Sequence, residues 1–124
     1  MGHQLIFWRE GGDTPSAASV YSSLMEGSRT AGLTDLPIDR IIDRFAVAFE
    51  GIDRPLPFEP TGPIFWEDPA SVTSLQVWWT STHVGVELRP VGLFSHDVAN
   101  RVIDLMREFD CPLYDPQVDQ RFSA

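Results

Sequence analysis

Lysine is absent from this sequence of 124 residues: all nine basic residues are arginine, while 18 acidic residues leave a formal net charge of -9. Proteins that bind nucleic acid neutralise its phosphates with clustered lysine and arginine side chains. The charge balance therefore argues against nucleic acid as a partner and favours a basic protein. We interpret the lack of lysine as the mark of a G+C-rich bacterial genome rather than as a functional choice.

Cysteine and long apolar runs are also scarce. Cys111 is the single cysteine, so the chain forms no internal disulfide, which is typical of a reducing compartment. No apolar run approaches the roughly 20 residues that span a bilayer. The first ten residues lack the basic start and the long apolar stretch of a signal peptide. We therefore expect a cytoplasmic protein that does not associate with membranes.

Motifs for catalysis and for metal binding are missing. The three histidines, His3, His83 and His96, lack the i, i+4 spacing of a helical zinc site. There is no G-x-S-x-G motif and no glycine-rich phosphate loop. Cys111 precedes a proline and a predicted buried strand, which favours a structural thiol over a nucleophile. We predict no catalytic residues, no metal site and no cofactor.

What is present is the composition of one folded domain. Hydrophobic residues make up 43% and charged residues 22% of the chain, which is ordinary for a globular protein. We predict a single domain over residues 1–124. Apolar periodicity predicts, in order, strand 4–9, helix 17–27, helix 37–51, strand 74–80, strand 83–89, helix 95–109 and strand 111–114. This order indicates an α+β fold, a two-layer sandwich of about four mostly antiparallel strands with three helices on one face.

Two segments are predicted to be irregular. Residues 53–69 contain five prolines, too many for a helix or a central strand. Residues 117–124 form a polar tail. Within the predicted hairpin, Ser81 and Thr82 suit the tight primed turns poorly, so we expect a longer or a bulged connection between its strands.

Tryptophan provides the clearest functional signal. Trp78 and Trp79 are adjacent in a predicted strand, so their side chains point to opposite faces of the sheet. If helices cover only one face, one of these rings contributes to a contact surface, unless a loop or a second copy of the chain covers it. With the aromatic and acidic residues of the proline-rich segment and the hairpin, the candidate partner-binding residues are Phe65, Trp66, Glu67, Asp68, Trp78, Trp79 and Glu87.

Several segments together resemble a group of small uncharacterised bacterial proteins. They are the aromatic first strand at residues 5–8, the helix that begins at Pro37, the strand 77–79 and the closing CPLYDPQ at 111–117. In that group an aromatic first strand pairs with a terminal helix that runs into a YDPQ strand end. The resemblance covers most of the chain, its distinctive part is the last motif, and it implies no activity. The proline-rich segment departs from the group.

Three functions fit these observations. The first is a non-enzymatic binding protein, such as a bacterial immunity or antitoxin-like protein that covers a basic toxin through an acidic surface. The second is a small enzyme or ligand-binding protein with a site between residues 58–68 and the sheet, using Trp66, Trp79, Glu67 and His83. The third is a homo-oligomeric accessory subunit, with a homodimer interface at the spare tryptophan.

Overall fold

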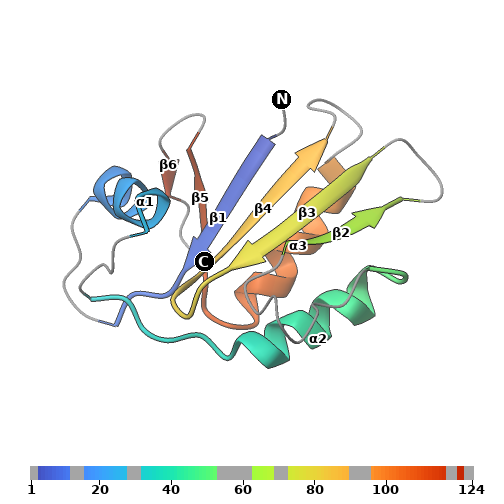
Figure 1. Ribbon diagram of the computed structural model, residues 1–124, viewed down its shortest axis with the longest axis horizontal. Coiled ribbons are helices and arrows are strands. Elements are labelled where there is room, and N and C mark those ends of the chain that lie inside the picture. Colours follow the sequence, from blue (N-terminus) through green and yellow to red (C-terminus); the bar gives the residue numbers. More distant parts are fainter. Residues whose placement is uncertain are drawn as a thin grey trace.

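The computed structural model describes residues 3–11, 16–27, 32–52, 63–68, 73–89, 96–116 and 120–121. Its elements follow one another as β1 (His3–Trp8), α1 (Ala17–Met25), α2 (Ile38–Ala48), β2 (Ile64–Glu67), β3 (Ser74–Trp79), β4 (His83–Arg89), α3 (His96–Arg107), β5 (Leu113–Asp115) and β6 (Gln120–Arg121). The strands form one sheet of six in the order β2-β3-β4-β1-β5-β6 (Figure 1). Every pairing is antiparallel. The predicted α+β class is confirmed.

Helix boundaries follow from local chemistry. The Ser16 side chain accepts a hydrogen bond from the Ser19 backbone N–H, which caps α1, and Gly27 follows the helix with a φ of 76°. Pro37 precedes α2, where its fixed φ suits a helix start, and Gly51 ends that segment with a φ of 89°. Among the described residues, no helix has the length and apolarity required to cross a membrane.

One face of the sheet carries the larger core. Helices α2 and α3 pack on this face against inward-pointing side chains of the strands. Alternation along β3 places Leu75, Val77 and Trp79 in this core, and Leu5 and Phe7 of β1 join them. The central strands are therefore anchored by two amphipathic helices.

The opposite face is covered by α1, which corrects the prediction that all three helices share one face. Ile6 and Trp8 alternate with Leu5 and Phe7 along β1, so they point to the other side of the sheet. There they form a second buried cluster with residues of α1 and β5, namely Ile6, Trp8, Val20, Leu24 and Tyr114. Figure 1 shows α1 beside β5 and β6, at the end of the sheet away from β2 and β3.

Two strands lie in segments that the sequence predicted to be irregular. β2 follows Pro63 and is the terminal strand of the sheet, the position where neighbouring proline is tolerated. It has only four residues, of which Ile64 and Trp66 are buried while Phe65 and Glu67 are exposed. β6 is a two-residue strand inside the predicted polar tail. The sheet accordingly has six strands rather than the predicted four; residues 53–62 of the proline-rich segment lie outside the described residues.

The hairpin of β3 and β4 is confirmed, but its connection is tight. The register runs without interruption from Ser74 opposite Arg89 to Trp79 opposite Val84, so it contains no bulge. Neither Ser81 nor Thr82 has a positive φ, so the turn is not of the primed type. The Thr80 hydroxyl stabilises it by accepting a hydrogen bond from the Thr82 backbone N–H at 3.3 Å. A side chain thus supports a turn that backbone preference alone disfavours.

Candidate functional site

The half of the second face built by β2, β3 and β4 lies outside the α1 cluster. Side chains that alternate with the core residues emerge here, and Phe65 is the most exposed large apolar residue among them, at 50%. Trp78 is half-buried and packs at the border of the α1 cluster. This surface, which we call the open sheet face, is the candidate functional site.

Strand register arranges the open sheet face in rows. Each row runs across neighbouring strands, with side chains of paired residues about 5 Å apart. One row crosses from β2 to β1 and consists of Phe65, Gln76, Glu87 and Gln4. The next row consists of Glu67, Ser74 and Arg89. An exposed aromatic ring therefore lies in line with an amide and a carboxylate.

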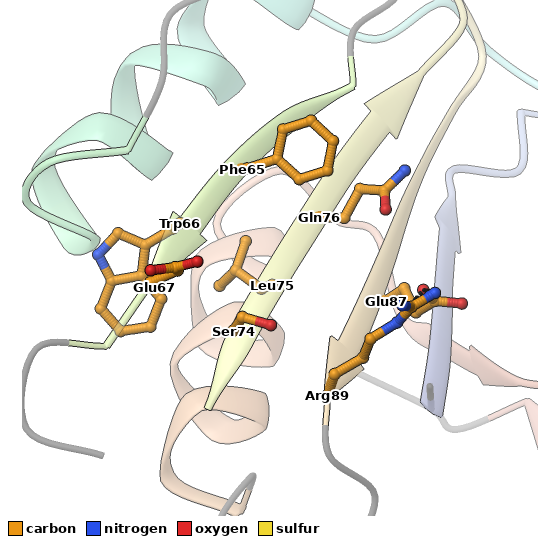
Figure 2. Close-up of a pocket in the computed structure, with 8 residues that line it drawn as sticks. All are labelled: Phe65, Trp66, Glu67, Ser74, Leu75, Gln76, Glu87 and Arg89. Carbon is orange, nitrogen blue, oxygen red and sulfur yellow. Dashed lines mark hydrogen bonds and ion pairs between the residues drawn. The ribbon is translucent and has the colours of Figure 1, made fainter. Parts of the chain in front are cut away.

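A shallow hollow lies on this surface. Its volume is about 130 Å³, and side chains from all three strands line it, among them Phe65, Glu67, Gln76 and Glu87. Figure 2 shows Phe65 and Gln76 extending from neighbouring strands, with the Glu87 and Arg89 side chains close together on the third. The hollow combines an apolar side with acidic and amide groups.

Glu87 forms an ion pair with Arg89 inside the hollow. Nη2 of Arg89 contacts Oε2 of Glu87 at 2.6 Å, and Nε donates to the same oxygen at 2.8 Å. The Glu87 side chain is only 17% exposed, whereas the Arg89 side chain is 61% exposed. The carboxylate is therefore set into the sheet surface, and the guanidinium that neutralises it lies mostly in solvent.

Trp78 reaches across the neighbouring strand because its register partner is Gly85. A Cβ atom built on Gly85 would lie 2.2 Å from Cε2 of Trp78, so the indole occupies the space of the missing side chain. The ring lies against the sheet rather than standing out from it. This packing and the contact with the α1 cluster together explain why Trp78 is half-buried.

His83 shares this sheet face but lies away from the hollow. Its residue is 2% exposed, its Nδ1 lies 2.7 Å from the Thr80 hydroxyl, and its Nε2 has no hydrogen-bond partner. Burial lowers the pKa of His83 from 6.5 to about 4. Because His83 and Arg89 are at opposite ends of β4, roughly 20 Å separates them along the strand. His83 is therefore a neutral buried residue that does not contribute to the hollow.

Comparison with known proteins adds nothing to this geometry. No protein-family model, curated protein or solved structure matches the chain. Within the described ranges, no group of three His, Cys, Asp or Glu side chains is arranged to hold a metal ion. Cys111 is buried at 1% exposure, and its thiol donates to the Phe109 carbonyl oxygen at 3.5 Å.

The structure separates the seven predicted partner-binding residues into two groups. Trp66 and Trp79 are 6% and 4% exposed and pack against α2 and α3, so they are core residues. Trp66 also donates from Nε1 to the Glu50 carbonyl oxygen at 3.0 Å. The other five lie on or next to the open sheet face. Strand alternation places Phe65, Glu67, Trp78 and Glu87 on it, and Asp68 directly follows Glu67 at the end of β2.

Four polar residues of the open sheet face were missed by sequence reasoning, namely Gln4, Ser74, Gln76 and Arg89. Their only sequence signal is the alternation of polar and apolar residues in the hairpin, which places Gln76 and Arg89 on the same side as Glu87. Gln4 joins them through the β1–β4 register, and it accepts a hydrogen bond from the Tyr21 hydroxyl of α1 at 2.9 Å. That tyrosine marks the border between the covered and the open part of the face.

Proposed function

We propose that this chain is a non-enzymatic binding protein that docks a basic protein partner on its open sheet face, as a bacterial immunity protein covers a toxin. The observation that supports this most is the juxtaposition of exposed Phe65 with the carboxylates of Glu67 and Glu87 on one continuous strand surface. An apolar anchor beside acidic groups is suited to a protein interface, where aromatic residues supply much of the binding energy.

The shape of the hollow supports a protein partner over a small molecule. Its volume of about 130 Å³ is well below the roughly 300–1,000 Å³ of typical ligand pockets. The four residues that a ligand-binding or enzymatic site would use also do not converge. Trp66 and Trp79 point toward α2 and α3 on one face of the sheet. Glu67 and His83 lie on the opposite face, at opposite ends of the strands. The enzymatic alternative is therefore the weaker proposal.

Charge supports a basic partner. The chain carries a net charge of -9, and the hollow holds two carboxylates against one guanidinium. Long-range attraction between such a surface and a basic protein raises the association rate by orders of magnitude at low salt. The same charge repels nucleic acid, so the partner in this proposal is a protein. The proposed setting of this binding is the bacterial cytoplasm.

The test is capture of a partner by tagged protein in extract of the native host. We expect one stoichiometric basic protein, whose capture is lost in the double variant Phe65→Ala, Glu67→Arg. The matched control is Val47→Ala, Glu26→Arg, which removes an exposed apolar side chain and reverses an exposed charge elsewhere. Loss of the partner in both variants, or recovery of the bait alone, contradicts the proposal.

A second copy of the chain is the competing occupant of this surface, because Phe65 is exposed on the terminal strand β2. Sedimentation analysis separates the two readings. A monomer at micromolar concentration agrees with a foreign partner, whereas a dimer that Phe65→Ala dissociates supports the homo-oligomeric accessory subunit.

A further inference from the structure

The Glu87 carboxylate is incompletely used by its own chain. Both contacts from Arg89 end on Oε2, and no side chain in the described part of the molecule bonds Oε1. A carboxylate accepts two parallel N–H bonds from a guanidinium when the two groups meet end to end. Arg89 is two residues from Glu87 on the same strand, and from there it reaches a single oxygen. The strongest geometry for this carboxylate is left unformed.

Release of Arg89 costs little. Its side chain is 61% exposed, and exposed ion pairs contribute about 0–1 kcal/mol to stability. Glu87 is different, because a carboxylate that is 17% exposed loses more from being left without a cation. An incoming guanidinium keeps Glu87 paired, so the exchange differs in the second parallel N–H bond that it adds and in the exposed contact that Arg89 gives up.

We propose that Glu87 is the binding site for an arginine side chain of the protein partner, and that Arg89 occupies this site as an internal substitute until the partner arrives. The inference rests on the proposed function, because it names the side chain that the open sheet face recognises. In the complex the partner's guanidinium binds both oxygens of Glu87, and Arg89 swings into solvent.

The neighbours of Glu87 favour arginine over lysine. Gln76 is its register partner on β3, and Phe65 follows Gln76 on β2, so the exposed ring lies about 10 Å across the sheet from Glu87. A guanidinium bound at Glu87 keeps its apolar stem over Gln76 and toward the Phe65 ring. Lysine presents a point charge that cannot form the two-bond arrangement. The carboxylate of Glu87 thus suits the guanidinium of an arginine, and the distance from Glu87 to the Phe65 ring suits its apolar stem.

The test uses N-acetyl-arginine amide as the probe, so that it does not depend on finding the partner. Two-dimensional NMR spectra of the labelled protein are recorded during titration with the probe at millimolar concentration. We expect shifts at Phe65, Gln76, Glu87 and Arg89, weaker ones with N-acetyl-lysine amide, and none in Glu87→Gln. Retention of the native spectrum in the free variant shows that it is folded.

The decisive comparison is between two variants that lose one arginine each. Arg89→Ala removes the internal competitor, so the affinity for the probe should rise about threefold, the value of an exposed ion pair. Arg107→Ala makes the same change in net charge on α3, where Arg107 pairs with Asp104 at 3.7 Å, and should leave the affinity unchanged. Equal affinities in the two variants, or shifts elsewhere on the molecule, overturn the proposal. Partner capture that survives Glu87→Gln also overturns this inference while leaving the proposed function intact.

Discussion

His83 is the residue whose chemistry is most at odds with its surroundings. Its Nδ1 lies 2.7 Å from the Thr80 hydroxyl, while Nε2 is buried without a partner. A proton on Nδ1 leaves an unused lone pair at Nε2, which costs less than an N–H donor buried without an acceptor. The ring is therefore held neutral, and burial lowers its pKa to about 4.

This pKa predicts how stability depends on pH. In the unfolded chain His83 regains a pKa near 6.5, so between pH 6.5 and 4 the unfolded state binds more protons than the folded state. Stability that is present above pH 6.5 is thus lost as the pH falls toward 4, by on the order of 3 kcal/mol. Urea unfolding at pH 7 and pH 4.5 measures the loss. His83→Leu should remove this part of the slope; an unchanged slope in the variant contradicts the prediction.

Gly85 and Trp78 form a pair in which one residue supplies the space for the other. Gly85→Ala places a Cβ atom 2.2 Å from the indole, so the ring must move. We expect a loss of about 1–3 kcal/mol of unfolding free energy, the usual cost of overpacking. Because Trp78→Val removes the obstruction, Gly85→Ala should cost little in that background. Unfolding by urea of the four members of the cycle measures the coupling, and simple additivity of the two changes argues against it.

Helix α3 is joined to its neighbours by arginines. The Arg101 guanidinium lies 4.6 Å from the Phe49 ring centroid and 5.5 Å from that of Trp66, and it donates to the Ala48 carbonyl oxygen at 3.2 Å. Arg44 of α2 forms two hydrogen bonds to the Glu108 carboxylate, at 3.1 and 2.9 Å. These bonds hold the pKa of Glu108 below its usual value. The contacts of Arg101 connect α3 with the end of α2 and with β2.

Removal of Arg101 should loosen this junction. Arg101→Ala loses two ring contacts and a carbonyl partner, so we expect a loss of about 1 kcal/mol of unfolding free energy. Arg101→Lys should recover part of it, because an ammonium is attracted to the rings but does not stack on them. Arg107→Ala, on the same helix, is the control and should have little effect. Thermal unfolding ranks the three variants; equal midpoints for Arg101→Ala and Arg107→Ala would refute the role.

The two helical layers cover hydrophobic clusters of different size. The cluster under α1 has five buried residues, of which α1 itself contributes only Val20 and Leu24. The cluster under α2 and α3 is several times larger. Because local opening requires less free energy where less apolar surface is buried, the α1 amides should exchange with deuterium faster than those of α2 and α3. Leu24→Ala should accelerate exchange in α1 while leaving α2 and α3 protected. Uniform exchange across all three helices contradicts this ranking.

The sequence predicted most elements, the antiparallel pairing and the β3–β4 hairpin, but it missed two short strands and the side of the sheet that α1 covers. Ser16, Gly27 and Pro37 mark helix ends by local chemistry, so the helices were placed correctly. The position of α1 was missed because an apolar helix face does not specify which side of a sheet it covers. A signal was available in β1, where residues 5–8 are apolar at every position and therefore buried on both sides.

The candidate site was predicted less completely, for a physical reason. Phe65, Glu67, Trp78 and Glu87 are distinctive as residues, but alternation in a strand of four residues was too short to show that Trp66 points into the core. Gln4 and Gln76 are ordinary residues, and only the register of β1, β3 and β4 brings them into one row with Glu87. Which residues lie beside Glu87 is set by strand pairing between distant segments, and a local sequence pattern does not reveal it.

The placement of the tryptophans has an optical consequence. Trp8, Trp66 and Trp79 are at most 6% exposed, whereas Trp78 is half-buried on the same sheet face as the hollow. A neutral quencher such as acrylamide should therefore act mainly on Trp78, while the other three indoles fluoresce undisturbed. Because Trp78 is two residues from Gln76, its intrinsic fluorescence can report the binding of a partner to the open sheet face without an added label.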